Sequence, residues 1–209
     1  MSITVTTWYL EQTSPEDLRP SPAPGGDLRI ERAGVPSPEF SRFLYTAVGG
    51  DLHWVDRLGL TYAQWREILE RPGTETWVAY EQGTPAGYVE LRAHDAEDGD
   101  GVGDGGAVEI VYFGLLPAFR GRGIGGHLLS YGTARAWDLA GRWPGRTPTK
   151  RVVLNTCSLD GEHAMDNYLR RGFRLYDTQT AERPETEAPG AWPGAGDRSG
   201  GPAASRAGA

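Results

Sequence analysis

The sequence has very little of several residue types, and each scarcity excludes a class of protein. Cys157 is the single cysteine among 209 residues, so no disulfide can form within the chain. No apolar run approaches the roughly 18 residues of a membrane-spanning helix, and no basic segment followed by an apolar one opens the chain. Four histidines are too few for a convincing metal site. These absences predict a cytoplasmic protein that holds no metal and does not enter a membrane.

Positive charge is also scarce. The formal net charge is −7 and the isoelectric point is near 5.1. Proteins that bind nucleic acids or anionic membranes carry a basic patch, and no such patch is visible in this sequence. The balance is compatible with a cationic or neutral substrate, although overall charge alone does not identify one.

Strand and helix patterns alternate in the first half of the chain. Ser37 and Pro38 form a cap and first turn for one helix, and Thr61 with Gln64 has the form of a capping box for a second. The turn chemistry of Gln82–Pro85 predicts a hairpin. The expected strands are Ile3–Glu11, Leu28–Ala33, Thr76–Glu81 and Ala86–Arg92.

The second half continues as strand, helix, strand, helix and strand. We expect strands at Ala107–Leu116, Arg151–Cys157 and Phe173–Thr178, and helices at Gly123–Ala140 and Gly161–Arg170. An acidic, glycine-rich loop is expected at Ala93–Gly106. Together these elements predict an α/β or mixed α+β fold with one domain over 28–180, preceded by an N-terminal strand and a proline-rich connection over 1–27. A disordered tail is expected over 181–209.

The strongest local signal is a glycine-rich loop between a buried strand and a helix. It contains Arg120, Gly121, Arg122, Gly123, Ile124, Gly125 and Gly126. Glycine lets the backbone turn tightly and approach a ligand, and the first N–H groups of a helix have no partner within it. With the helix dipole, these groups form an anion site suited to pyrophosphate, to which the two arginines would add charge.

The same loop admits two other interpretations. Gly121, Gly123 and Gly126 match the dinucleotide fingerprint, but four residues separate the strand from the first glycine. No acidic residue follows about twenty positions later, where that fingerprint has one. A helix entry with no ligand is the second alternative. It is disfavoured because four glycines weaken a helix start without structural benefit.

Three motifs in this order resemble those of the GCN5-related N-acetyltransferase (GNAT) family. Arg120, Gly123 and Gly125 match its loop signature, and Phe113–Pro117 is similar to the strand motif that precedes it. Ala164 and the segment Tyr168–Phe173 match the motif that follows. The resemblance covers about residues 108–173. Since the C-terminal strand pair typical of the family looks incomplete here, the N-terminal strand would either complete the sheet or join a dimer.

The resemblance implies a splayed mixed β-sheet flanked by helices, with acetyl-CoA as the acyl donor. The glycine loop would hold the pyrophosphate, and the pantetheine arm would lie along Phe113–Leu115. The backbone N–H of Leu115 would donate a hydrogen bond to the developing oxyanion. The implied reaction is direct acetyl transfer to an amine, with a small molecule as the first choice of acceptor and a protein or peptide as the second. A non-catalytic CoA-binding module is the alternative outside enzymes.

Glu109 is the preferred general base. It lies between apolar Val108 and Ile110 on the expected central strand, where burial would raise its pKa toward a useful range. The alternatives for Glu109 are a strand-edge cap or an arginine pair, and Glu90 or a bound water could serve as the base instead. Tyr168 matches the family position for an acid toward the leaving thiolate, although an aromatic packed on the sheet is its other interpretation.

Other candidates are weaker. Cys157 is more typical of a small apolar filler than of a nucleophile because no fixed histidine partner is visible. His127 follows the glycine loop, and His163 precedes Tyr168. Each could shape the site or be solvated. Tyr45, His53, Trp54 and Trp65 form either a wall of the acceptor pocket or an aromatic core. We expect a monomer or a homodimer.

Overall fold

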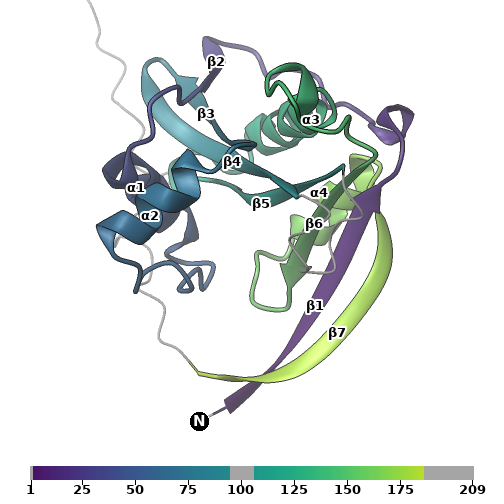
Figure 1. The fold of residues 1–209 in the computed structure, drawn as a ribbon. Helices are drawn as coiled ribbons and strands as arrows, with labels where there is room; N and C mark the ends of the chain where they lie inside the picture. Colours follow the sequence, from purple (N-terminus) through teal and green to yellow (C-terminus); the bar gives the residue numbers. More distant parts are fainter. Residues whose placement is uncertain (1, 95–105, 186–209) are drawn as a thin grey trace, which may run out of the picture.

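Seven strands form one mixed sheet in the computed structural model, which describes residues 2–94 and 106–185 (Figure 1). Along the sheet the order is β2-β3-β4-β5-β6-β1-β7, and neighbouring strands are antiparallel except for the pair β5–β6. The strands are β1 (Ser2–Gln12), β2 (Leu28–Arg32), β3 (Thr74–Glu81), β4 (Thr84–His94), β5 (Ala107–Leu115), β6 (Arg151–Cys157) and β7 (Arg174–Pro184).

Four helices join these strands, namely α1 (Pro38–Gly49), α2 (Tyr62–Glu70), α3 (Ile124–Trp137) and α4 (Ala164–Arg170). The predicted caps are present: the Ser37 side chain accepts from the N–H of Phe40, and Thr61 forms a complete capping box with Gln64. No helix of the described residues is long and apolar enough to cross a membrane.

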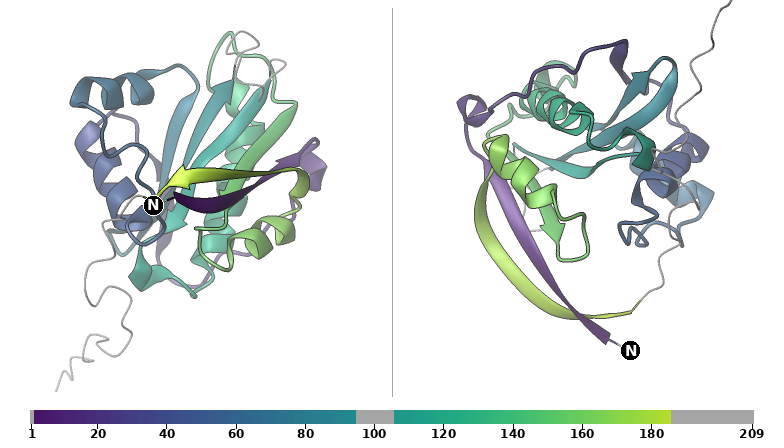
Figure 2. Two further views of the ribbon diagram at one scale, coloured as in Figure 1. Left: turned by 90° about the horizontal axis from the view of Figure 1, so that it is seen from below. Right: turned by 180° about the vertical axis from the view of Figure 1, so that it is seen from behind.

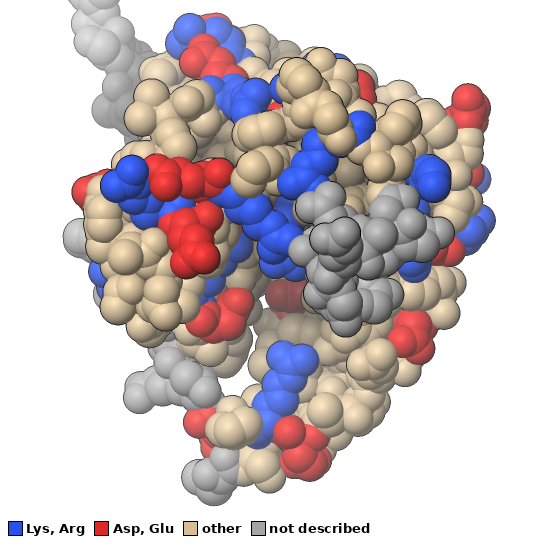
Figure 3. All heavy atoms as spheres, viewed as in Figure 1, with Lys and Arg blue, Asp and Glu red and all other residues tan. Residues whose placement is uncertain are grey.

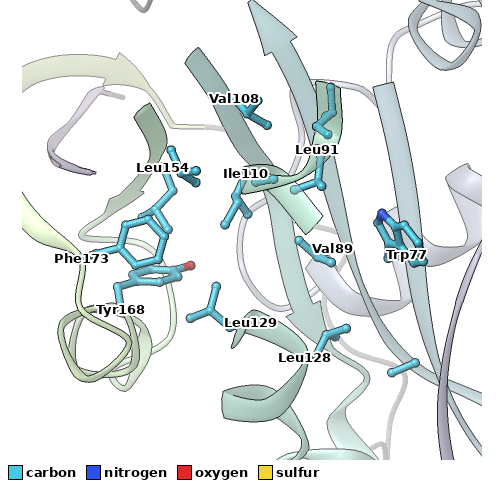
Figure 4. Close-up of a cluster of buried hydrophobic side chains, with 14 of the residues drawn as sticks. Trp77, Val89, Leu91, Val108, Ile110, Leu128, Leu129, Leu154, Tyr168 and Phe173 are labelled. Atoms are coloured by element: carbon cyan, nitrogen blue, oxygen red, sulfur yellow. The ribbon is translucent and has the colours of Figure 1, made fainter. Parts of the chain in front are cut away.

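The helices lie on opposite faces of the sheet. Side chains of α3 and α4, including Leu128, Leu129 and Tyr168, share a buried cluster with Val89 and Ile110 of the central strands (Figure 4). A smaller cluster on the other face packs α1 against β3 and β4, through Leu44, Val48, Val78 and Tyr88. Residues alternate along β4 and β5 between these two clusters, as strand geometry requires. The mixed sheet flanked by helices confirms the predicted fold class.

The N-terminal strand completes the sheet within the same chain. β1 pairs with β6 on one side and with β7 on the other, so the first and last strands run together as a curved two-stranded arm (Figures 1 and 2). β7 is longer than predicted and ends at Pro184, so four residues expected in the tail belong to the strand. All of its residues are exposed, which explains why no apolar alternation revealed its length.

The central strands separate partway along their length. β5 and β6 pair only from Ala107–Arg151 to Glu109–Val153, and they diverge beyond that point. On its other side, β5 loses register with β4 at Val111, where one residue is extra. The predicted splay is therefore present, and it opens a space in the middle of the sheet. Most of the acidic loop (95–105) and most of the tail (186–209) lie outside the described residues.

Candidate active site

A cavity of about 1090 Å³ occupies the space between β5 and β6. It reaches the N-terminus of α3 at one end and the α1–α2 connection at the other, with α4 and Arg183 of β7 completing its wall. Figure 3 shows the hollow on this face of the molecule, with acidic and basic side chains interspersed around it. Of the predicted cofactor residues, seven line the cavity: Phe113, Leu115, Arg120, Gly121, Gly123, Gly125 and Gly126.

The backbone of β5 presents free polar groups to this cavity. The N–H of Leu116 donates to the carbonyl of Ala86, which fixes the alternation of the β4–β5 ladder. In an antiparallel ladder alternate residues turn their N–H and C=O groups to opposite sides. Phe113 and Leu115 consequently direct theirs away from β4 and toward the gap. There the carbonyl of Leu115 accepts a hydrogen bond from Nε of Arg120 at 3.1 Å.

The glycine loop turns through left-handed backbone and then enters α3. Gly121 and Gly123 have φ angles of 71° and 81°, which side-chain-bearing residues rarely adopt. Gly123 is the N-cap of α3, and no side chain caps this end of the helix. The N–H groups of the first turn are therefore available to an anion beside the cavity. Ile124 points into the core instead, since it is only 1% exposed and does not line the cavity.

The two loop arginines, predicted to add charge to the anion site, are engaged by carboxylates. Arg120 donates to both oxygens of Asp51, at 2.5 and 2.9 Å, and to the carbonyl of Val48. This guanidinium lowers the pKa of the Asp51 carboxyl. Arg122 pairs with Glu81 at 2.5 Å and is not part of the cavity wall. Arg120 thus ties the glycine loop to the α1–α2 connection, and the loop's anion site depends mainly on its backbone.

Glu109 lines the cavity as a buried carboxylate with two basic partners. Its Oε2 accepts from Nη2 of Arg92 at 2.6 Å and contacts Nε2 of His94 at 2.9 Å. Burial alone raises the pKa of the Glu109 carboxyl, but the hydrogen bond from His94 and the charge of Arg92 outweigh it, so the pKa lies below its usual range. The expectation of a raised pKa is therefore wrong, because it considered burial and not these two neighbours on β4.

Glu90 occupies a different environment and does not line the cavity. Its two oxygens accept from the guanidinium of Arg57 at 2.7 and 3.0 Å, and the Glu90 side chain is only 1% exposed. The guanidinium also lies over the ring of Tyr112, 4.4 Å from its centroid. Glu90 is thus half of a buried ion pair that fastens the α1–α2 connection to the sheet. This geometry disfavours it as a base.

Tyr168 lies across the cavity from β5. Its ring packs edge-on against Phe113 and Phe173, with centroids 6.2 and 6.4 Å away, and Figure 4 shows its hydroxyl directed toward Ile110 and Leu129. Burial raises the pKa of this phenol, with a smaller contribution from the carboxylate of Asp160. The hydroxyl consequently stays protonated at neutral pH, as a proton donor must.

The remaining candidates are divided between the cavity and the surface. Cys157, His53 and His163 line the cavity, whereas His127 contacts the carbonyl of Ser21. Burial raises the pKa of the Cys157 thiol, which keeps it neutral and makes it a poor nucleophile. His53 has a φ of 57°, an unusual backbone conformation at a cavity wall.

Several polar residues at the cavity were missed by the sequence analysis. Those that line it are Asp56, Arg57, Arg92, Asn155 and Asp160. His94 and Asp51 contact the lining residues Glu109 and Arg120. Asp51 to Arg57 belong to an irregular connection without periodicity. For Arg92 and His94 a signal did exist, since both stand on the same face of a strand as Glu90, where three ionisable residues alternate with apolar ones.

Comparison with known families agrees with this geometry. The model of the acetyltransferase (GNAT) family matches residues 43–173, which is more than half of the chain. The chain belongs to the GNAT family. The match includes the glycine loop, β5, Glu109 and Tyr168, whereas β1 and β7 lie outside it. No curated protein matches the chain.

Solved structures share the fold at low sequence identity. A GCN5-related N-acetyltransferase from Kribbella flavida has a TM-score of 0.57 and 20% identity, covering 88% of this GNAT chain and 61% of its own. One from Sphaerobacter thermophilus has a TM-score of 0.54 and 19% identity, covering 90% and 55%. An aminoglycoside acetyltransferase from an uncultured soil metagenomic sample has a TM-score of 0.50 and 14% identity, covering 68% and 85%. The chain spans less than two thirds of the first two structures' length.

Proposed function

We propose that this GNAT protein transfers an acetyl group from acetyl-CoA to a primary amine of a small molecule. One observation carries the proposal: a single cavity joins the outward backbone groups of β5 and the uncapped start of α3 to Glu109 on one wall and Tyr168 on another. An acyl donor with a pyrophosphate and an amide-containing arm fits the first two features. The two side chains supply proton transfer for the reaction.

The residues present fit acetyl-CoA at each part of the cavity. The uncapped N–H groups after Gly123 suit the pyrophosphate. The N–H and C=O groups of Phe113 suit an amide of the pantetheine arm, in the way that a strand edge binds an extended chain. When bound, acetyl-CoA supplies the thioester carbonyl that the acceptor nitrogen attacks.

Three groups of the chain would assist the transfer. The N–H of Leu115 donates a hydrogen bond to the carbonyl oxygen as it gains negative charge. Glu109 accepts, through bound water because six residues of β5 separate it from Leu115, the proton that the nitrogen loses as its bond to the carbonyl carbon forms. Arg92 and His94 hold the carboxylate in place. Tyr168 donates its proton to the sulfur as the carbon–sulfur bond breaks. A free ammonium has a pKa of about 10.4, so Glu109, with its lowered pKa, serves an acceptor that binds already neutral.

Calorimetric titration with acetyl-CoA tests the cofactor assignment. We expect saturable binding, with no binding of NADH or ATP. Gly123→Asp should weaken it at least tenfold, because a side chain at a φ of 81° is strained and the carboxylate repels pyrophosphate. Gly145→Asp is the matched control, since Gly145 has a φ of 89° and open space around it. Equal affinity of the two variants, or no binding by the folded wild type, would overturn the proposal.

Tyr168→Phe isolates the proposed acid. Phenylalanine preserves the packing against Phe113 and Phe173, so the fold and acetyl-CoA affinity should not change. We expect kcat to fall by about 100-fold, the lower end for a general acid because a thiolate is a good leaving group. Thiol release over pH 6–10 provides the measurement. An unchanged kcat would show that Tyr168 contributes only packing and is not the acid.

A further inference from the structure

One carboxylate at the cavity is held by tyrosines instead of arginines. Asp56, in the α1–α2 connection, accepts from the hydroxyl of Tyr45 at 2.6 Å and from that of Tyr112 through its other oxygen. Burial is the main cause that raises the pKa of both phenols, and the Asp56 carboxylate adds to it, so both remain neutral donors. These bonds orient the exposed carboxylate without neutralising it.

The charges around Asp56 leave it without a cation of its own. Arg57 is the adjacent basic residue, and its bidentate partner is Glu90. The other basic side chains of this wall are likewise paired, namely Arg92 with Glu109 and Arg120 with Asp51. Arg183, on strand β7 of the arm, lines a different part of the cavity, near Cys157 of β6. Among the described residues no basic side chain forms an ion pair with Asp56, so this end of the cavity carries a surplus negative charge.

Aromatic rings complete the surroundings of Asp56. The ring of Trp54 lies 4.9 Å from that of Tyr112 and 5.7 Å from that of Tyr45. Trp54 is held over bare backbone, because a Cβ at Gly49 would lie 2.3 Å from its ring. Arg57 already covers one face of Tyr112, so Trp54 provides the free aromatic surface of this wall. A fixed indole beside an uncompensated carboxylate attracts an organic cation.

We propose that Asp56, Tyr45, Tyr112 and Trp54, here called the carboxylate box, bind a second and unreacting ammonium group of the acceptor. This inference rests on the proposed function, in which the reacting amine attacks the thioester beside Leu115. The acceptor class is then a diamine or polyamine. Tyr112 precedes Leu115 by three residues of β5 in unbroken register with β4, which places the two amino groups roughly 10 Å apart.

The test compares 1,7-diaminoheptane, heptylamine and 1,3-diaminopropane as acceptors for the wild type and Asp56→Asn. Asparagine keeps the size of the side chain and can still accept from a tyrosine hydroxyl, so it removes mainly the charge. We expect the KM for 1,7-diaminoheptane to rise at least tenfold, with less than a twofold change for heptylamine and an unchanged acetyl-CoA affinity. The wild type should prefer the longer diamine to 1,3-diaminopropane. Glu70→Gln, which removes a surface carboxylate of α2, is the control.

Direct binding separates this inference from the proposed function. Calorimetry of 1,7-diaminoheptane with the protein, in the presence and absence of CoA, requires no acetyl transfer. Binding by the wild type that Asp56→Asn loses supports the carboxylate box even when no transfer occurs. An equal loss for both amines, a diamine preference that Asp56→Asn retains, or no diamine binding by the wild type overturns it. The acetyl-CoA titration with Gly123→Asp and Gly145→Asp tests the proposed function separately.

Discussion

Glu109→Gln should lower kcat by about 1000-fold while leaving acetyl-CoA affinity unchanged. The amide cannot accept a proton, and general bases contribute roughly 10²–10⁴ to a rate. Glutamine has the size of glutamate and its oxygen can still accept from Arg92 or His94, so the cavity should keep its shape. Thiol release with a saturating amine measures kcat, and calorimetry measures the affinity for acetyl-CoA.

The pH profile tests whether the acceptor reacts as the neutral amine. Because the pKa of Glu109 is lowered, the carboxylate is ionised at every pH above its ordinary value of about 4.3. Between pH 6 and 9 the wild-type rate should therefore follow deprotonation of the acceptor, and its midpoint should shift with the pKa of the amine used. In Glu109→Gln the residual rate should keep this dependence at a lower level.

Two variants control for indirect effects at Glu109. Glu70→Gln also removes a carboxylate, but from an exposed pair on α2, so its kcat should match the wild type. Arg92→Gln removes a partner of Glu109 and keeps the carboxylate, so it should reduce kcat less than Glu109→Gln does. If Glu109→Gln kept a third or more of the wild-type kcat, a bound water held elsewhere would be the better assignment.

Local signals predicted most of the elements because their causes are local. The Ser37 cap and the Thr61 capping box start α1 and α2 where expected, and the predicted bounds of β6 match the structure. The pairing of strands that are distant in the sequence could not be predicted from local patterns. β1 lies between β6 and β7 because of registers that join residues near opposite ends of the chain, such as Ser2 and Pro184. No periodicity within either strand encodes such a partner.

In the candidate site, too, features set by local sequence were predicted and contacts between distant segments were not. The resemblance placed Phe113, Leu115 and the glycines at the cavity, since these positions depend on a strand and the loop that follows it. It did not reveal where the loop arginines point, because Asp51 and Glu81 come from segments far from them in sequence. The pKa of Glu109 was predicted in the wrong direction for a related reason: burial is a property of one position, whereas ion pairing needs the partner.

Breaking the buried Arg57–Glu90 pair should be the largest single loss of stability. Glu90→Leu leaves the Arg57 guanidinium, whose side chain is 8% exposed, without its bidentate partner. Removing one member of a buried ion pair costs about 3–5 kcal/mol. Urea denaturation followed by tryptophan fluorescence measures the change in unfolding free energy.

The double variant Arg57→Met/Glu90→Leu separates the buried charge from the shape of the site. It removes both ions and fills their space with apolar atoms, so it should recover most of the stability that Glu90→Leu loses. Glu70→Leu, which breaks the exposed Arg66–Glu70 pair, should change stability little. If Glu90→Leu were no more destabilising than Glu70→Leu, the pair would not be what fastens the α1–α2 connection. Asp56 and Trp54 belong to the same connection. A loss of anchoring in Glu90→Leu should therefore also weaken binding of 1,7-diaminoheptane.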